Sequence, residues 1–116
     1  MAKPRYLLRA GYDFEILRLF TNDTGSGATA EDLSAATLIE ACVKNYGKTA
    51  ELITDTTQTN TGSASWSTGI VAIRFTAAQT TGLVAQSGWI EVAVVLAGTR
   101  IRYEDIPVDI EAGFLS

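Results

Sequence analysis

Residues 88–96, with the sequence GWIEVAVVL, form the longest nearly unbroken apolar run in the chain. The run is rich in β-branched and aromatic residues, and Gly88 and Gly98 stand at its two ends. It is much shorter than the roughly 18 apolar residues that a membrane-spanning helix requires, and it lacks residues that start or stop a helix. The run therefore predicts a central strand that is buried on both faces.

Length and composition indicate one globular domain. The chain has 116 residues, which is enough for one hydrophobic core and too few for two domains. Apolar residues make up 47% and charged residues 19%, as in a folded soluble protein. The net charge is −4 and the nine lysines and arginines are scattered, so nucleic acid is not an expected partner. We predict a single domain over residues 1–116.

The N-terminal sequence MAKPRY has no apolar run followed by a small-residue cleavage site, so no signal peptide is predicted. No stretch is apolar for long enough to span a membrane, and no membrane partner is expected. The protein is therefore predicted to be made in the cytoplasm. Residues 1–5 are expected to be a flexible end, because Lys3 and Pro4 contribute nothing to a core.

The sequence offers few groups for catalysis or metal binding. It contains one cysteine, Cys42, and no histidine, which excludes a Ser/His/Asp triad, an internal disulfide and the common zinc sites within one chain. Acidic pairs such as Asp13/Glu15 and Glu104/Asp105 are better explained as a solvent-facing strand and a turn than as a glycosidase pair. We predict that the protein is not an enzyme and uses no cofactor or metal. Cys42 is interpreted as a buried structural thiol.

Residues 6–20 are predicted to be extended, in two short strands if Gly11 breaks the segment. Between residues 12 and 16, apolar and acidic side chains alternate, which is the period of a strand with one solvent-facing side. With Leu17 and Leu19 the apolar residues shift from even-numbered to odd-numbered positions. A bulge, a bend or a passage from one sheet to the other would explain that change.

Further strands are predicted where β-branched and apolar residues cluster between turn formers. They cover residues 37–44, 50–54, 69–76, 88–96, 99–103 and 108–114. A helix is the alternative for residues 30–41, which are rich in alanine and leucine, but Thr37, Ile39 and Val43 favour a strand. Residues 45–48, NYGK, are predicted to form the following turn.

Three connections carry local signals. Residues 77–82 are predicted to form one short helical turn that crosses between sheets, because Thr76 is followed by Gln79 as in a capping box. The pair Ala97-Gly98 is predicted to be a tight turn. Ile106-Pro107 is expected to interrupt the last strand, with the proline at an edge position or a strand start.

Two polar stretches are predicted to lie outside the regular strands: residues 21–32 as a loop, and residues 55–65 as a long loop or a poorly ordered edge. The first is rich in turn formers, and the second is dominated by threonine and has no apolar face. Asp23 and Asp32 lack the regular acidic spacing of a calcium loop, so we interpret them as solvated. The candidate interface residues on or beside these loops are Asn22, Asp23, Thr24, Gln58, Thr59, Asn60 and Trp66.

About seven short strands, with turn signals at intervals near 8–12 residues, are the pattern of a β-sandwich of immunoglobulin size. The predicted fold class is therefore all-β: an immunoglobulin-like β-sandwich of about seven strands with one short helical turn near residues 77–82. The sequence contains no evident internal repeat, so one sandwich accounts for the chain.

Residues 66–83, WSTGIVAIRFTAAQTTGL, followed by residues 88–92, GWIEV, resemble the N-terminal immunoglobulin-like domain of phage baseplate upper proteins and similar phage tail proteins. The shared pattern is a strand that ends in a Thr-led helical turn, before a Gly-aromatic pair that opens a long apolar strand. Other stretches similar to that domain are residues 12–16 (YDFEI), residues 32–37 (DLSAAT) and Gly113-Phe114.

The resemblance implies an architectural role as a non-enzymatic structural component of a bacteriophage virion, in its tail, baseplate or neck or associated with its capsid. It implies a homo-oligomer that docks to other virion proteins and is located in the virion. Family members commonly continue into a linker and helical or fibre segments, whereas this sequence ends at Ser116. That departure favours a small stand-alone virion protein.

The alternative is a small carbohydrate-binding β-sandwich. Exposed aromatic side chains of many such modules stack on sugar rings, and Trp66 with Tyr46 would be the platform here. In a domain of this size, however, one of Trp66 and Trp89 is expected to anchor the core and the other to pack beside a loop. The missing secretion signal and calcium ligands also count against this alternative.

Overall fold

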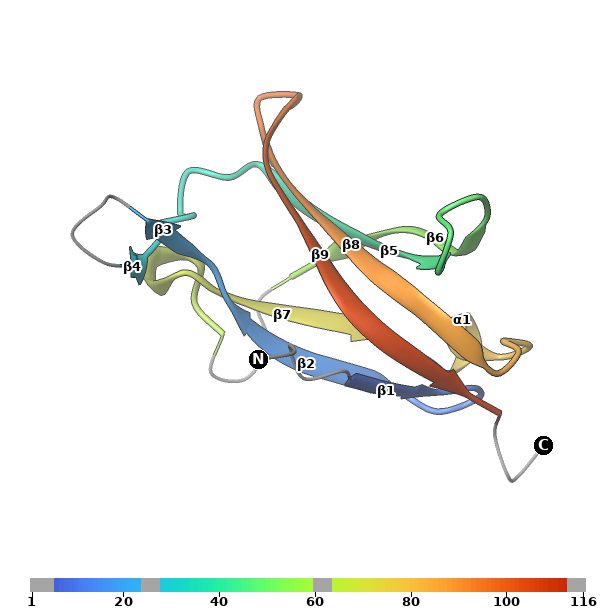
Figure 1. Cartoon of the computed structure of the whole chain (residues 1–116). Helices are drawn as coiled ribbons and strands as arrows, with labels where there is room; N and C mark the ends of the chain where they lie inside the picture. Colours follow the sequence, from blue (N-terminus) through green and yellow to red (C-terminus); the bar gives the residue numbers. More distant parts are fainter. Residues whose placement is uncertain (1–5, 24–27, 60–63, 113–116) are drawn as a thin grey trace.

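The computed structural model describes residues 6–23, 28–59 and 64–112 of the chain (Figure 1). These residues are mostly β-strand, with one 3-10 turn, η1 (Trp66–Thr68), and one four-residue helix, α1 (Ala77–Thr80). The prediction of an all-β protein with one short helical turn is confirmed. None of the helices in the described part of the chain is long and apolar enough to cross a membrane.

The larger sheet has five strands in the order β1-β9-β8-β5-β6. They are β1 (Tyr6–Arg9), β5 (Leu38–Asn45), β6 (Glu51–Gln58), β8 (Gln86–Leu96) and β9 (Thr99–Glu111). β1 pairs with β9 in parallel, and the other neighbours are antiparallel. β8 therefore lies in the middle of this sheet, as its apolar run predicts, and β5 is a strand rather than the alternative helix.

The second layer is a two-stranded sheet of β2 (Phe14–Leu19) and β7 (Ile70–Phe75). A short hairpin of β3 (Thr21–Asp23) and β4 (Ala28–Ala30) continues from β2. The layers curl into a sandwich-like half-barrel (Figure 1). β5, β8 and β9 are neighbours in the larger sheet, and β2 and β7 pair in the smaller one. α1 connects β7 to β8, so the predicted crossing between sheets is confirmed.

The core lies between the two sheets. β8 contributes its inward residues from Ile90 to Val94, which are completely buried. The other large side chains that are fully buried are Leu8, Phe20, Ile39, Val43, Val71, Ile73, Phe75, Ile106 and Val108. On the opposite face of β8, Glu91, Ala93 and Val95 are at most 9% exposed, which confirms that this strand is covered on both faces.

Local signals place the connections correctly. Thr76 and Gln79 form a capping box at the start of α1, in which each side chain accepts a hydrogen bond from the backbone N–H of the other. Ala97 and Gly98 have φ of 50° and 85°, as the two central residues of a type I′ hairpin turn require. Gly11, with φ of 82°, lies in the turn between β1 and β2.

The predicted change of parity in β2 is wrong. All six residues of β2 pair with β7 in an unbroken register, without a bulge. Phe14 is buried and Ile16 is half-buried, whereas Leu17 and Leu19 are 47% and 52% exposed. The alternation therefore continues through the strand, and the two leucines lie on the outer face of the smaller sheet.

The predicted interruption at Ile106-Pro107 is also wrong, because β9 runs unbroken from Thr99 to Glu111. Among the described residues, β1 pairs with β9 only from Val108 onward. Pro107 therefore stands where this edge of β9 is open, the kind of edge position at which a missing N–H is tolerated.

Both polar stretches are partly strand, so a loop is wrong for part of each, and the part of residues 55–65 in β6 lies at an edge of the larger sheet. Within residues 21–32, β3 and β4 form a hairpin, and within residues 55–65, β6 continues as far as Gln58. The polar end of β6 is held by backbone pairing with β5 rather than by an apolar face of its own. The predicted flexible end at residues 1–5 lies outside the described residues.

Candidate functional site

A group of charged and aromatic side chains covers the outer face of the five-stranded sheet. Glu91 lies at its centre on β8, where its cross-strand neighbours are Cys42 on β5 and Asp105 on β9. Lys44 on β5 and Lys48 in the turn that follows reach the Glu91 carboxylate. The Glu91 network is defined as Lys44, Lys48, Glu91, Tyr103 and Asp105.

Short ion pairs hold this network around a carboxylate that is only 9% exposed. Lys44 Nζ lies 2.9 Å from Glu91 Oε1, and Lys48 Nζ lies 3.3 Å from Glu91 Oε2. Lys48 Nζ also donates to Asp105 Oδ2 at 2.5 Å, so this ammonium group bridges two carboxylates. Tyr103 lines the same recess as Glu91. These contacts tie β5, β8 and β9 together across their outer face.

The contacts move the pKa values in the network away from neutrality. Burial opposes ionisation of Glu91, but the neighbouring Tyr103 side chain and the two lysines outweigh it and hold the Glu91 pKa below its usual value. A hydrogen bond to Glu91 raises the Lys44 pKa, and one to Asp105 raises the Lys48 pKa. Partial burial, followed by the nearby Glu91 and Asp105 carboxylates, raises the Tyr103 pKa. Efficient proton transfer favours pKa values near the working pH. Because the pKa values of the network are shifted away from neutrality, the network is better suited to stabilising the sheet than to acid–base catalysis.

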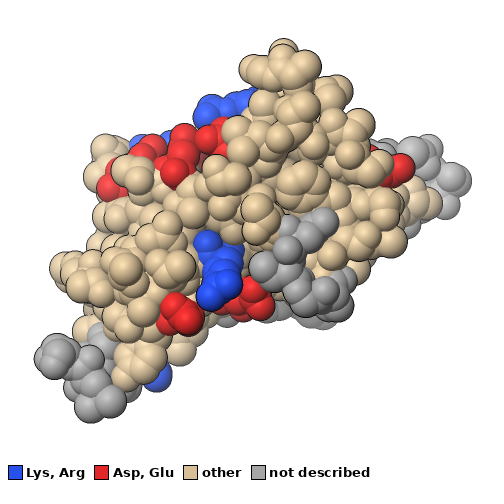
Figure 2. All heavy atoms as spheres, turned by 180° about the vertical axis from the view of Figure 1, so that it is seen from behind, with Lys and Arg blue, Asp and Glu red and all other residues tan. Residues whose placement is uncertain are grey.

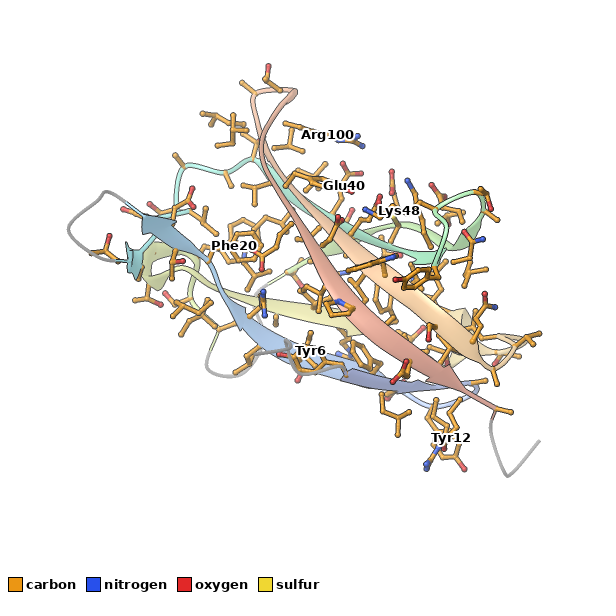
Figure 3. All side chains as sticks on the ribbon, viewed as in Figure 1. Tyr6, Tyr12, Phe20, Glu40, Lys48 and Arg100 are labelled. Carbon is orange, nitrogen blue, oxygen red and sulfur yellow. The ribbon has the colours of Figure 1, made fainter. Side chains whose placement is uncertain are left out.

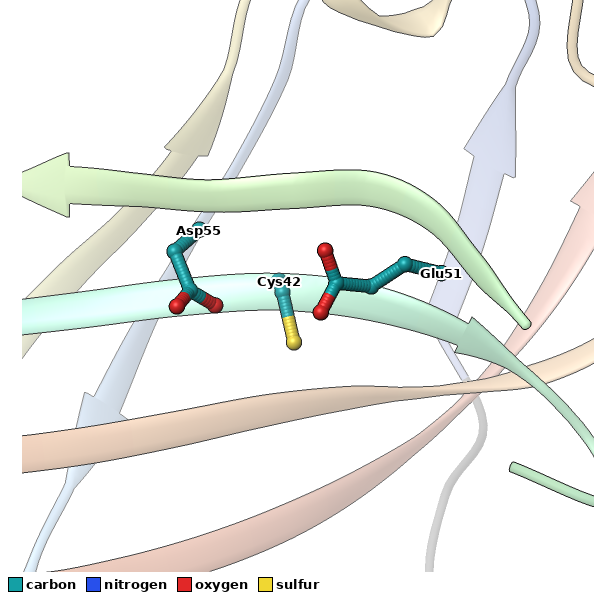
Figure 4. A group of neighbouring side chains, drawn as sticks. All are labelled: Cys42, Glu51 and Asp55. Atoms are coloured by element: carbon teal, nitrogen blue, oxygen red, sulfur yellow. The ribbon is translucent and has the colours of Figure 1, made fainter. Parts of the chain in front are cut away.

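A recess of about 110 Å³ opens beside the network, next to Cys42. Cys42 Sγ, one carboxylate oxygen of Glu51 and one of Asp55 lie within 4.8 Å of one another (Figure 4). Burial, with the charges of Glu91 and these two carboxylates, raises the pKa of the Cys42 thiol to about 12. The thiol is thus protonated at neutral pH, whereas metals bind the thiolate. Cys42 is buried as predicted, and its surroundings fit a structural thiol better than a metal site.

Arg100 extends over the same face from β9. Its Nη2 lies 3.9 Å from Glu40 Oε1 and 3.8 Å from Asp55 Oδ2, and 65% of its side chain is exposed. Figure 3 shows Arg100, Glu40 and Lys48 on this side of the sheet, whereas Phe20 lies between the sheets. Contacts this long and this exposed contribute little to stability.

One pair of aromatic rings borders the network. The Tyr46 and Trp89 rings lie with their centroids 5.8 Å apart, and Trp89 Nε1 donates to the Tyr46 carbonyl oxygen at 2.9 Å. Lys48 Nζ lies 5.4 Å from the centre of the Trp89 ring and 5.9 Å from that of Tyr103, within cation–π range. Tyr46 is 63% exposed, so this pair is open to solvent at one end.

The interface residues predicted from the sequence do not form one surface. Asn22 and Asp23 lie in β3, and Trp66 begins η1 beside that hairpin, where its carbonyl oxygen accepts from the Leu33 N–H. The Trp66 side chain is half-buried and packs against the core, so it is not a free platform. Thr24 lies outside the described residues.

Gln58 and Thr59 lie near the other end of β7. Gln58 is 2% exposed, and its side-chain amide accepts from Arg74 N at 2.7 Å and donates to Arg74 O at 3.2 Å. The amide thereby continues the hydrogen-bond ladder along the edge of β7 and joins the two sheets. Thr59 is exposed and lines, with Arg74, a polar recess of about 260 Å³. Asn60 lies outside the described residues.

Large apolar side chains are exposed at the end of the β8–β9 hairpin. We define the hairpin tip as residues 96–103, in which Leu96 is 38%, Ile101 52% and Tyr103 51% exposed. In Figure 1 the end of this hairpin stands clear of the neighbouring strands. A register shift between Val94 and Val95 marks where the tip departs from the regular ladder.

A second exposed apolar surface lies on the smaller sheet. We define the β2 face as Leu17 and Leu19 with the half-buried Ile70 opposite Leu19; Ala72, opposite Leu17, is completely buried. Both leucines are about half exposed, at ordered positions of a paired strand. In the view from behind, charged side chains gather in a few small groups, and most of the visible surface carries none (Figure 2). At the tip and on the β2 face, exposed apolar side chains lie together on paired strands, so we take both as candidate contact surfaces.

Comparison with models of known protein families finds no match, and comparison with curated proteins finds no similar sequence. Sequence reasoning missed the Glu91 network. Its one signal is that Glu91 is the only charged residue in residues 88–96. Its partners come from distant strands, and only the pairing of β5, β8 and β9 brings them together.

Proposed function

We propose that this protein is a non-enzymatic structural component of a bacteriophage virion, which acts by self-association and by docking to other virion proteins. The resemblance of residues 66–83 and 88–92 to phage tail domains supports the virion setting. The observation that carries the self-association is the exposure of Leu17 and Leu19 at ordered strand positions.

The physical argument starts from the outer face of β2. In a sandwich whose inner face forms the core, the outer positions of an antiparallel strand are normally polar. Leu17 and Leu19 occupy two successive outer positions, and the half-buried Ile70 lies opposite Leu19. Covering such a surface with another protein is favourable by about 25 cal/mol per Å² of apolar area. Contiguous apolar positions of this kind mark a contact surface more often than scattered ones do.

Light scattering over a wide range of protein concentrations tests the self-association. We expect species larger than the 12.4 kDa monomer, in proportions that grow with concentration. A protein that stays monomeric at its highest soluble concentration would contradict the proposal. The virion setting has its own test, because peptides of this chain should be found by mass spectrometry in purified particles of the phage that encodes it. Particles complete in every other structural protein but lacking these peptides would refute that setting.

Carbohydrate binding is the second candidate, and the exposed Tyr46 ring beside Trp89 is the observation that favours it. The half-buried Trp66 supports it less than the sequence suggests. A glycan array probed with the protein and with Tyr46→Ala tests this alternative. Binding that is lost in the variant supports it, and no binding by the unmodified protein rejects it.

A further inference from the structure

We propose that the side chains of Lys48 and Asp105 condense into an amide cross-link, an isopeptide bond that the chain forms by itself with Glu91 as the proton carrier. The site is the part of the Glu91 network where one ammonium group meets two carboxylates. Lys48 Nζ lies 2.5 Å from Asp105 Oδ2 and 3.3 Å from Glu91 Oε2. The reaction takes place within one chain, so its test is independent of the proposed self-association.

The turn that follows β5 fixes the position of Lys48. Its φ of 58° lies in the left-handed region, which residues other than glycine and asparagine rarely adopt. The Lys48 N–H donates to the Asn45 carbonyl oxygen at 2.9 Å, and the Asn45 side chain accepts from the N–H groups of Thr49 and Ala50. The amine is therefore held beside the carboxyl group with which it reacts. Groups held in this way can react as if at effective concentrations of about 10⁵–10⁸ M.

The surroundings of Asp105 favour a neutral amide over a carboxylate. Asp105 Oδ1 is buried and has no hydrogen-bond partner among the described residues. An unpaired buried oxygen that shares a negative charge costs more free energy than the oxygen of a neutral amide. Oδ2, which Lys48 contacts, is the oxygen that the amide nitrogen would replace. The Trp89 and Tyr103 rings flank the same ammonium group, with their centres 5.4 Å and 5.9 Å from Nζ.

Glu91 supplies the proton transfers. Its carboxylate accepts a proton from the Lys48 ammonium group, and the free amine attacks Asp105 Cγ. Glu91 then carries this proton and a second one from the attacking nitrogen to Oδ2, which leaves as water. A C–N bond replaces a C–O bond, nothing is oxidised or reduced, and Glu91 ends as the carboxylate that it was at the start.

The reaction is slow but does not need to be fast. The raised pKa of Lys48 and the lowered pKa of Glu91 both oppose the first proton transfer. A bond that forms once in each chain tolerates that cost, because no turnover is required. The product would connect the turn after β5 to β9, on the two sides of the central strand β8. Such a cross-link restricts the unfolded chain in the way that a disulfide does.

Mass spectrometry of the unmodified protein is the direct test. During incubation for days at mildly alkaline pH, the intact chain is expected to become lighter by one water molecule. After trypsin digestion, the loss should be found in a branched peptide that joins Lys48 to Asp105. A mass that does not change would overturn the proposal. So would a loss of water confined to a linear peptide, which is the product expected of an aspartate succinimide.

Three variants test the roles of the residues, and circular dichroism establishes that each is folded. Lys48→Arg keeps the charge but removes the nucleophile, so it should form no cross-link. The matched control is Lys44→Arg, because Lys44 pairs with the same Glu91 carboxylate at 2.9 Å, and it should react as the unmodified protein does. Glu91→Gln should slow the reaction by about a hundredfold or more. A cross-link in Lys48→Arg, or its loss in Lys44→Arg as well, would overturn the assigned bond, and an unchanged rate in Glu91→Gln would overturn the assigned proton carrier.

Discussion

Replacing Glu91 by glutamine tests how much the network on the outer face contributes to stability. The substitution keeps the shape of the side chain but removes a charge that pairs with Lys44 and Lys48. Hydrogen bonds to charged groups contribute roughly 1.5–3 kcal/mol each when they are buried. The lysines are partly exposed, which reduces their share, so we expect Glu91→Gln to lower the free energy of unfolding by about 2 kcal/mol.

The matched control is Glu111→Gln. Glu111 Oε1 lies 2.7 Å from Arg9 Nη2, a distance similar to those around Glu91, but the two side chains are 40% and 37% exposed. An exposed pair of this kind contributes about 0.2–1 kcal/mol. The difference between the two variants therefore measures the effect of burial on an ion pair of similar geometry.

The pH dependence has a definite sign. The Glu91 pKa is lower in the folded protein than its usual value of 4.5, so the folded state favours the ionised carboxylate. The resulting stabilisation is fully present above that value and is lost as the pH falls through the lower folded pKa. The difference in unfolding free energy between the protein and Glu91→Gln should thus be constant from pH 7 to pH 5.5 and shrink below pH 4.5.

Urea unfolding followed by tryptophan fluorescence measures both quantities, at pH 7 and at a series of lower pH values. A loss of stability in Glu91→Gln no larger than that in Glu111→Gln would refute the importance of the buried network. A difference that does not shrink on acidification would refute the assigned pKa direction, even if the variant is destabilised.

Three further outcomes are expected. Gly69→Ala should lower the free energy of unfolding by more than about 2 kcal/mol, and Gly82→Ala by only about 1–2 kcal/mol. Calorimetry measures both losses. Both glycines have positive φ, but a Cβ added at Gly69 would lie 2.7 Å from a backbone oxygen, whereas one added at Gly82 would meet open space. Equal losses of unfolding free energy in the two variants would contradict the close approach at Gly69. Gln58→Leu should cost about 1–3 kcal/mol in urea unfolding because it leaves the Arg74 backbone unpaired, and a neutral result would contradict that bridge. Iodoacetamide at pH 8 should modify Cys42 slowly in the folded protein and rapidly in urea, because the pKa of the Cys42 thiol in the folded protein is about 12. Equal modification rates in the two conditions would show that the folded protein holds an accessible thiolate.

The parts of the fold that could be predicted from the sequence have local causes. The apolar run at residues 88–96 identifies the central strand because a strand buried on both faces needs apolar side chains on both parities. Thr76 and Gln79 identify α1 because a capping box acts within one turn of chain. The turn at Ala97-Gly98 follows from backbone conformations that glycine adopts readily.

The parts that could not be predicted depend on partners distant in sequence. The polar end of β6 is a strand because β5 pairs with it and because Gln58 reaches Arg74 on the other sheet. Pro107 does not end β9, since the edge it occupies is open at that position among the described residues. The Glu91 network likewise requires the register of β5, β8 and β9, which composition and periodicity do not contain.

Leu17 and Leu19 are predicted to face the core through a bulge or bend in β2, but they lie on its outer face. That difference bears on function. The predicted bulge or bend assumes that every apolar residue of β2 faces the core. The unbroken register of β2 with β7 shows that this assumption is wrong. Folding therefore does not require leucine at either position, because polar side chains would satisfy the same strand. Residues that do not fit the pattern required for folding indicate a requirement other than folding. On the outer face of a paired strand, contact with another surface is the demand that we propose, so Leu17 and Leu19 carry the proposed self-association.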